Sequence, residues 1–111
     1  MFDHLKEYNI YIKPGFTDMR KRAGSLSLLV RSEMGMDPRE KSIFIFCGRD
    51  KRRVNAIVWD SNGWLEFSKR LSCFGMSFKW PSTTKETMSV TMADMEEMLW
   101  GGDPWRRFPE F

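Results

Sequence analysis

The chain has 111 residues with 41% hydrophobic and 14% aromatic content, which suffices for one folded domain over 1–111 and excludes a disordered chain. No apolar leader opens the chain, and no apolar run approaches the roughly 18–20 residues of a membrane span, so we expect a cytoplasmic protein without a membrane partner. The net charge of +3 is uneven: residues 1–81 hold 15 Lys and Arg against 9 Asp and Glu, and therefore favour anionic partners, whereas residues 82–111 hold 3 against 6.

The first half of the chain predicts a strand, a helix and a second strand. Residues 8–12 alternate with their apolar side chains on one face, and a Pro-Gly pair ends this strand. Thr17 or Asp18 then caps a helix whose apolar residues recur every three or four positions. The apolar run 43–47 is typical of a strand covered on both faces, and therefore of the centre of a sheet. The apolar face of the helix consists of Met19, Ala23, Leu26, Val30 and Met34.

The second half predicts strands joined by turns. Residues 48–53 contain a turn glycine and four cations, which indicates an exposed hairpin loop. The strand 54–59 follows, and a polar turn leads to the strand 64–71. A short strand ended by proline is expected at 77–80, and 88–90 is a candidate for one more.

A capping box formed by Thr91 and Asp94 predicts a final helix, which the pair Gly101-Gly102 ends. Its apolar face consists of Met92, Met95, Met98 and Leu99. The pattern predicts the α+β class, as a small single domain with an antiparallel four- to five-stranded sheet (a β-meander) and two main helices against one face. Residues 100–111 form a C-terminal tail that contains Trp, Pro and Arg.

Few residues argue for catalysis. The sole histidine, His4, lies near the N-terminus and offers no plausible base to a Ser or Cys nucleophile. Cys47 and Cys73 stand apart from any His, which favours neither a zinc site nor a disulfide framework. Asp60 and Glu66 would serve a metal-dependent nuclease only if carboxylates converged on a metal pair, and this is the weakest hypothesis. We expect no enzyme activity, no metal, no cofactor and no small-molecule substrate.

Basic residues are the main candidates for binding. Arg20-Lys21-Arg22 falls in the first turn of the predicted helix, where positive charge opposes the helix dipole, so local stability does not explain it. Arg31 shares a helix face with Arg20, with small residues between them that would let a phosphate backbone approach. The other candidates lie on the loop at 48–53 or close the strand 64–71. A solvated surface is the alternative. The predicted nucleic-acid-binding residues are Arg20, Arg31, Arg49, Lys51, Arg52, Arg53 and Arg70.

The aromatic residues divide into two groups. Trp59, Trp64 and Trp80 lie on predicted strands, where packing is expected and base stacking is the alternative. The tail places two tryptophans and a phenylalanine near an arginine pair, and such a segment docks either on its own sheet or on a partner. The predicted partner-binding residues are Trp100, Trp105 and Phe108.

Several short motifs occur in an order that resembles a known family. They are Thr17-Asp18-Met19-Arg20, Gly35-Met36-Asp37-Pro38, Phe44-Ile45-Phe46 with Gly48-Arg49, Val58-Trp59-Asp60, Asn62-Gly63-Trp64, Lys69-Arg70-Leu71 and Phe78-Lys79-Trp80-Pro81. Over nearly its whole length the chain resembles the small TnpB accessory proteins, which the second open reading frame of insertion sequence 66 family elements encodes. It departs from the family's pattern at Asn55, where the family tends to carry lysine.

The resemblance implies an accessory, non-catalytic role in DNA transposition beside a separate DDE-type transposase. The leading hypothesis is that the basic residues contact phosphates of the element DNA while an apolar patch binds the transposase. The alternative is a pure protein-protein interaction subunit without DNA binding, in which the basic loop only adds solubility.

Overall fold

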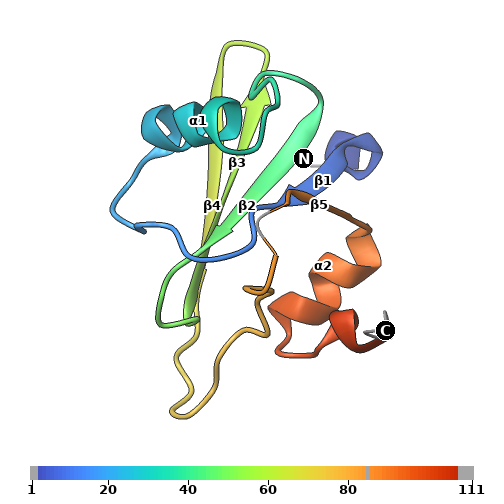
Figure 1. The fold of residues 1–111 in the computed structure, drawn as a ribbon. Coiled ribbons are helices and arrows are strands. Elements are labelled where there is room, and N and C mark those ends of the chain that lie inside the picture. Colours follow the sequence, from blue (N-terminus) through green and yellow to red (C-terminus); the bar gives the residue numbers. More distant parts are fainter. Residues whose placement is uncertain (1–2, 85, 108–111) are drawn as a thin grey trace.

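The computed structural model describes residues 3–84 and 86–107, and within them the chain forms a five-stranded sheet and two α-helices (Figure 1). The predicted α+β class is therefore confirmed. The elements in chain order are η1 (Asp3–Glu7), β1 (Asn9–Ile12), α1 (Ala23–Ser32), β2 (Ser42–Cys47), β3 (Arg53–Asp60), β4 (Gly63–Arg70), β5 (Met88–Val90), α2 (Met92–Leu99) and η2 (Pro104–Arg107).

The sheet is mixed, so the prediction of a fully antiparallel sheet was wrong. The strand order is β4-β3-β2-β1-β5, in which β2, β3 and β4 form the predicted antiparallel meander. β1 runs parallel to β2, and β5 runs antiparallel to β1. The parallel pair arises because α1 lies in the connection between β1 and β2, and such a crossover returns the chain to the same end of the sheet.

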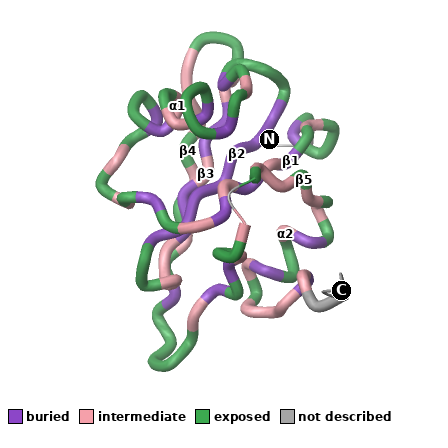
Figure 2. Tube along the Cα trace, in the orientation of Figure 1, coloured by how far each residue is buried: buried purple, intermediate pink, exposed green. Residues whose placement is uncertain are grey.

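The strand β2 lies at the centre of the sheet, as predicted, and all six of its residues are buried (Figure 2). Alternation along the strand directs Ile43 and Ile45 to one face and Phe44 and Phe46 to the other. The first pair belongs to the cluster that includes α2, and the second pair packs with α1. The prediction that both helices cover one face was therefore wrong, because a strand that is apolar on both sides needs cover on both.

The helix α1 begins at Ala23, later than the sequence predicted. Neither Thr17 nor Asp18 caps it, and its N-cap residue, Arg22, makes no side-chain cap bond. Instead, the backbone N–H of Ala23 donates to a carboxylate oxygen of Glu66 on β4 at 3.0 Å. Arg20 and Lys21 therefore precede the helix and Arg22 is its N-cap residue, so none of them lies in the first turn as predicted. Of the predicted apolar helix face, Ala23, Leu26 and Val30 lie in α1 and are buried. Met19 precedes the helix and is only partly buried, and Met34 follows the helix but is buried.

The helix α2 has the predicted capping box. The Thr91 hydroxyl accepts from the Asp94 backbone N–H at 3.0 Å, and the Asp94 carboxylate accepts from the Thr91 N–H at 3.1 Å. Gly101 follows the helix with φ of +93°, which suits a glycine after a helix end. At ten and eight residues, α1 and α2 are both too short to cross a bilayer, and the described part of the chain has no helix that could.

The predicted strand at 77–80 is absent, whereas the one at 88–90 is confirmed as β5. The chain from Phe78 to Trp80 is held by single hydrogen bonds instead of a ladder. The Phe78 N–H donates to the Lys51 carbonyl at 2.6 Å, and the Trp80 indole N–H donates to the Lys13 carbonyl at 3.1 Å. Both aromatic side chains are buried, so this segment closes one end of the core.

Candidate nucleic-acid interface

Four of the predicted binding arginines line one hollow of about 580 Å³. We call it the arginine hollow. It lies where β3 begins and β4 ends, on the face of the sheet that α1 covers. Residues four apart on a strand share a face, so Arg53 lies on the same face as Ile57, and Arg70 on the same face as Glu66. Its lining residues are Phe16, Thr17, Asp18, Met19, Arg20, Gly48, Arg49, Asp50, Arg53 and Arg70.

Three segments position these arginines. The β3–β4 ladder places Arg53 directly opposite Arg70. The turn between β2 and β3 supplies Arg49, and it is closed by the Gly48 N–H, which donates to the Arg53 carbonyl at 3.0 Å. The segment after β1 continues along β2, where the Thr17 N–H donates to the Cys47 carbonyl at 2.8 Å, and this path brings Arg20 to the hollow.

The charges in the hollow do not balance. Arg53 and Arg70 are paired across the ladder, and like charges directly opposite one another are unfavourable. Two carboxylates line the hollow, but both are engaged by the chain itself. Arg20 donates to both Asp18 oxygens, at 3.0 and 2.8 Å, and these hydrogen bonds hold the pKa of Asp18 well below its usual range. Asp50 accepts from the Arg52 backbone N–H at 3.0 Å.

The other three predicted cations lie apart from the lining. The Lys51 ammonium is 5.8 Å from the Phe16 ring centroid, at the rim of the hollow. The Arg52 guanidinium turns to the chain after β4 and donates to the Leu71 carbonyl at 3.1 Å. Arg31 lies in the last turn of α1, 3.7 Å from Asp37. Arg20 and Arg31 therefore do not share a helix face, because Arg20 is outside the helix.

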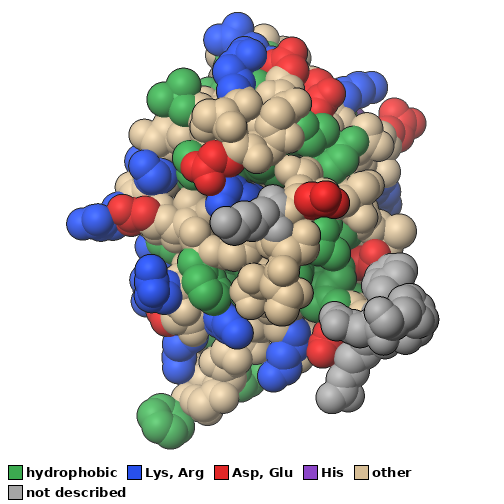
Figure 3. All heavy atoms as spheres, in the orientation of Figure 1, with side chains coloured by type: hydrophobic (Ala, Val, Ile, Leu, Met, Phe, Trp, Pro, Cys, Tyr) green, Lys and Arg blue, Asp and Glu red, His purple; other side chains and the backbone are tan. Residues whose placement is uncertain are grey.

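Figure 3 shows Lys and Arg side chains along the left and lower parts of the drawn face, and others at its top and upper right. In Figure 1 the segment between β1 and α1 and the turn between β2 and β3 lie at the left and lower left. Arg20 and Arg49 are thus carried by connections, and Arg53 and Arg70 by the strand ends beside them.

The three predicted partner-binding residues have different environments. Trp100 is 82% exposed, with the Lys69 ammonium 5.0 Å from its ring centroid. Trp105 docks on its own domain, because it packs against the core cluster that includes α2 and its indole N–H donates to the Lys79 carbonyl. Phe108 lies outside the described residues. Of these positions, Trp100 is the one that the described structure offers to a partner.

The loop after β4 carries two exposed apolar side chains. Phe74 is fully exposed, and Met76 is 39% exposed. The Met76 methyl group lies close to the backbone of Gly101, because a Cβ atom added there would be 3.3 Å from it. The loop therefore approaches the chain just after α2.

Asp60 and Glu66 do not converge. Alternation along β3 and β4 places Asp60 on the α2 side of the sheet and Glu66 on the α1 side. Asp60 lies 3.8 Å from the His4 ring nitrogen, and Glu66 caps α1. Within residues 3–84 and 86–107, no three acidic, His or Cys side chains are grouped as metal ligands. The geometry gives the nuclease hypothesis no support.

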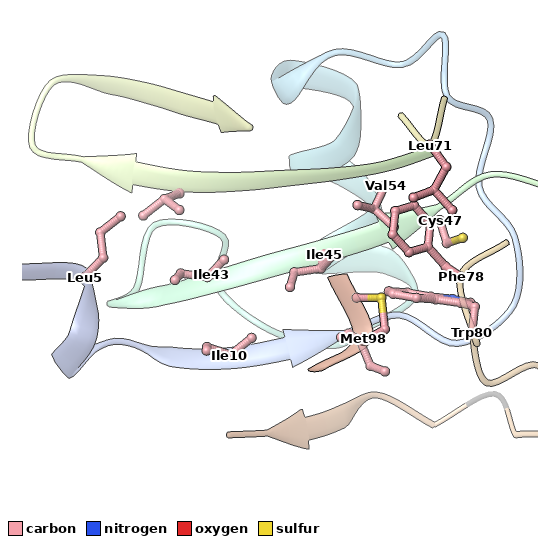
Figure 4. Packing of buried hydrophobic residues seen from close by; sticks show 12 residues of the cluster. Leu5, Ile10, Ile43, Ile45, Cys47, Val54, Leu71, Phe78, Trp80 and Met98 are labelled. Carbon is pink, nitrogen blue, oxygen red and sulfur yellow. The ribbon is translucent and has the colours of Figure 1, made fainter. Parts of the chain in front are cut away.

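A larger hollow of about 800 Å³ lies on the opposite face, between α2 and the sheet. We call it the apolar hollow. Figure 4 shows the cluster beneath it, with Ile43 and Ile45 on β2 and Met98 of α2 in the same group. The Lys69 ammonium lies at its rim and donates to the Leu99 carbonyl at the end of α2 at 2.6 Å. Its apolar lining consists of Leu5, Ile43, Ile45, Val54, Ala56, Phe67, Met92, Met95 and Leu99.

Sequence reasoning missed two residues that shape the sites. Phe16 lines the arginine hollow, and an aromatic residue directly after a Pro-Gly turn and before a basic segment was the available signal. Glu66 caps α1 from β4, and the unfavourable cations in the predicted first turn were a signal that the helix begins later. The tryptophan pair Trp59 and Trp64 packs edge to face at 5.1 Å, at the far end of the β3–β4 hairpin from the hollow.

Comparison with known proteins supports the family that the sequence motifs suggested. Residues 8–109 match the family described as IS66 Orf2 like protein. A protein of Sinorhizobium fredii (strain NBRC 101917 / NGR234), described as "Uncharacterized protein y4hO", is 33% identical over 97 residues, which cover 87% of this chain and 82% of the relative. No solved structure matches the chain. The chain belongs to the IS66 Orf2-like family of transposition accessory proteins.

Proposed function

We propose that this accessory protein is non-catalytic and binds the phosphate backbone of element DNA at the arginine hollow. The observation that supports this most is the opposition of Arg53 and Arg70 on neighbouring strands. Like charges at such a pair of positions are unfavourable, and an anion bound beside them would offset the repulsion. Arg49 and Arg20 approach the same space from two other segments. Four cations on one concave surface suit contact with successive phosphates.

Phosphate contacts predict how steeply the affinity for DNA falls as the salt concentration rises. Each neutralised phosphate releases counterions, so log affinity falls against log salt concentration with a slope of about −0.9 per phosphate. Arg20 is already paired with Asp18, so if Arg49, Arg53 and Arg70 each neutralise one phosphate, the slope for duplex DNA is roughly −2.7. Arg52 and Arg31 lie outside the hollow and contribute nothing to this value.

Fluorescence anisotropy of labelled element-end DNA across a salt series tests the proposal. The double variant Arg53→Ser with Arg70→Ser is expected to bind more weakly and to flatten the slope by about 1.8. Arg31→Ser is the matched control, because it removes an exposed arginine at the other end of α1. Absence of wild-type binding at low salt, or an equal loss in the control, would contradict the proposal.

We propose further that Trp100 contributes to a contact with the DDE-type transposase of the same element. A tryptophan that is 82% exposed is the type of anchor that protein interfaces bury. Co-purification of the two proteins is expected to fail for Trp100→Ser and to persist for Leu28→Ser, which alters an exposed apolar residue on α1. Co-purification without any DNA binding would favour the pure protein-protein interaction subunit.

A further inference from the structure

The arginine hollow has an aromatic wall as well as cations. Phe16 lines it, is 38% exposed and lies beside Lys51 at the rim. We infer that the hollow binds single-stranded DNA, with one unpaired base against the Phe16 ring and the phosphates of the strand on either side of it on the arginines. This inference rests on the proposed function and specifies the form of DNA that the same site accepts.

The shape of the site favours a single strand over a duplex. A volume of about 580 Å³ falls within the range of small-molecule pockets and accommodates one nucleotide. A duplex presents its phosphates at the surface but keeps its bases paired and stacked inside the helix, so duplex DNA could use the arginines but not the Phe16 ring. Sites for single strands combine a cationic surface with an aromatic ring on which a base stacks, and both are present here.

The backbone holds Phe16 at this position. The N–H of the preceding residue, Gly15, donates to the Pro81 carbonyl at 2.9 Å, and the N–H of the following residue, Thr17, donates to the Cys47 carbonyl at 2.8 Å. Gly15 has φ of +79°, a conformation that favours glycine and turns the chain sharply before the ring. The backbone that carries the ring is therefore fixed before a ligand arrives, which lowers the entropic cost of binding.

A polar atom of the wall also lacks a partner. Thr17 is 8% exposed, and its hydroxyl makes no hydrogen bond to any residue among those described. This hydroxyl is buried behind the wall, so the groups that the hollow itself presents to a nucleotide are the guanidinium groups and the Phe16 ring.

Competition binding with one labelled strand, used alone and annealed to its complement, tests the inference. The single strand is expected to bind more tightly than the duplex at equal salt. Phe16→Leu keeps an apolar side chain but removes the ring, so it is expected to weaken single-strand binding about five- to hundredfold and to leave duplex binding unchanged. Phe74→Leu is the matched control, because Phe74 is exposed and lies outside the hollow.

Two further measurements separate stacking from a structural role. Phe16→Tyr retains the ring and is expected to bind like the wild type. A strand with abasic sites should bind the wild type as weakly as the intact strand binds the Phe16→Leu variant. If single-stranded and duplex DNA bind equally and Phe16→Leu changes neither affinity, this inference is overturned, whereas the proposal of DNA binding stands. Equal weakening of duplex binding by Phe16→Leu would also overturn it, whereas no binding of either form overturns the proposed function itself.

Discussion

The arginine hollow and the apolar hollow lie on opposite faces of one sheet and are built in opposite ways. The first is lined by connections and strand ends, and it concentrates charges that repel one another. The second is lined by strand interiors and by α2, and its floor is part of the hydrophobic core. We therefore expect the first face to serve binding and the second to support the fold. The predictions below test this division, from the largest effect to the smallest.

The floor of the apolar hollow is expected to matter most for stability. Ile45 is 2% exposed and lines this hollow, so Ile45→Ala should lower the free energy of unfolding by about 2–5 kcal/mol. Urea denaturation followed by circular dichroism measures the loss. Arg49→Ala in the arginine hollow is the counterpart, with an expected change within about 0.5 kcal/mol. Equal losses would remove the distinction between the two faces.

The link between β4 and α1 is expected to have an intermediate effect. Glu66→Ala removes the carboxylate that accepts from the Ala23 N–H, and loss of a helix cap costs about 0.5–2 kcal/mol. The Ala23 amide should also exchange its hydrogen faster, as nuclear magnetic resonance can measure. Glu96→Ala, at the rim of the apolar hollow, serves as the control. Unchanged exchange at Ala23 would show that Glu66 is not its cap in solution.

Removing a cation from the arginine hollow is expected to stabilise the protein. Arg70→Ser eliminates the repulsion with Arg53 and should raise the free energy of unfolding by about 0.2–1 kcal/mol. The gain should shrink as salt is added, because ions screen exposed charges. Thermal denaturation at two salt concentrations measures both effects. A loss of stability at low salt would mean that Arg70 supports the fold, contrary to the division proposed.

The smallest effect concerns the one strongly shifted carboxyl pKa in the arginine hollow. Arg20 lowers the pKa of Asp18 through its hydrogen bonds, so Asp18 should remain ionised below pH 3.8, its ordinary value. The pKa of Asp18 is lower in the folded than in the unfolded protein. The contribution of Asp18 to folding stability is therefore complete above the unfolded pKa and is lost as the pH falls through the folded pKa. A carbon-detected titration of Asp18 should show an ordinary pKa in Arg20→Ala. An unchanged pKa would remove Arg20 as the cause.

The features that could be predicted from the sequence are those set by neighbouring residues. The capping box at Thr91 and Asp94 and the buried run of β2 follow from short patterns, and both are confirmed. The cap of α1 could not be predicted this way, because Glu66 lies 43 residues from Ala23. The mixed sheet depends on the path that the chain takes through α1, which residue types do not specify.

The candidate site was predicted only in part for the same reason. Composition singled out the cations, but their grouping depends on the register that sets Arg53 against Arg70. It also depends on the path of the segment after β1, which brings Phe16 and Arg20 beside the β2–β3 turn. Arg52 was predicted with its neighbours, yet its guanidinium turns to the Leu71 carbonyl. Neither register nor side-chain direction can be inferred from a cluster of basic residues alone.

The pairing of β1 with β5 has a consequence for the order of folding. Ile10 pairs with Val90, about 80 residues later in the chain, whereas β2, β3 and β4 are joined by short turns. Because closing a long loop costs more entropy than closing a short one, we expect the meander to form before β5 and α2 join it. Pulse-labelled hydrogen exchange should then protect β3 before β5. During synthesis the face beneath α2 would stay open until residues 92–99 have left the ribosome, and in this period the protein is most exposed to aggregation.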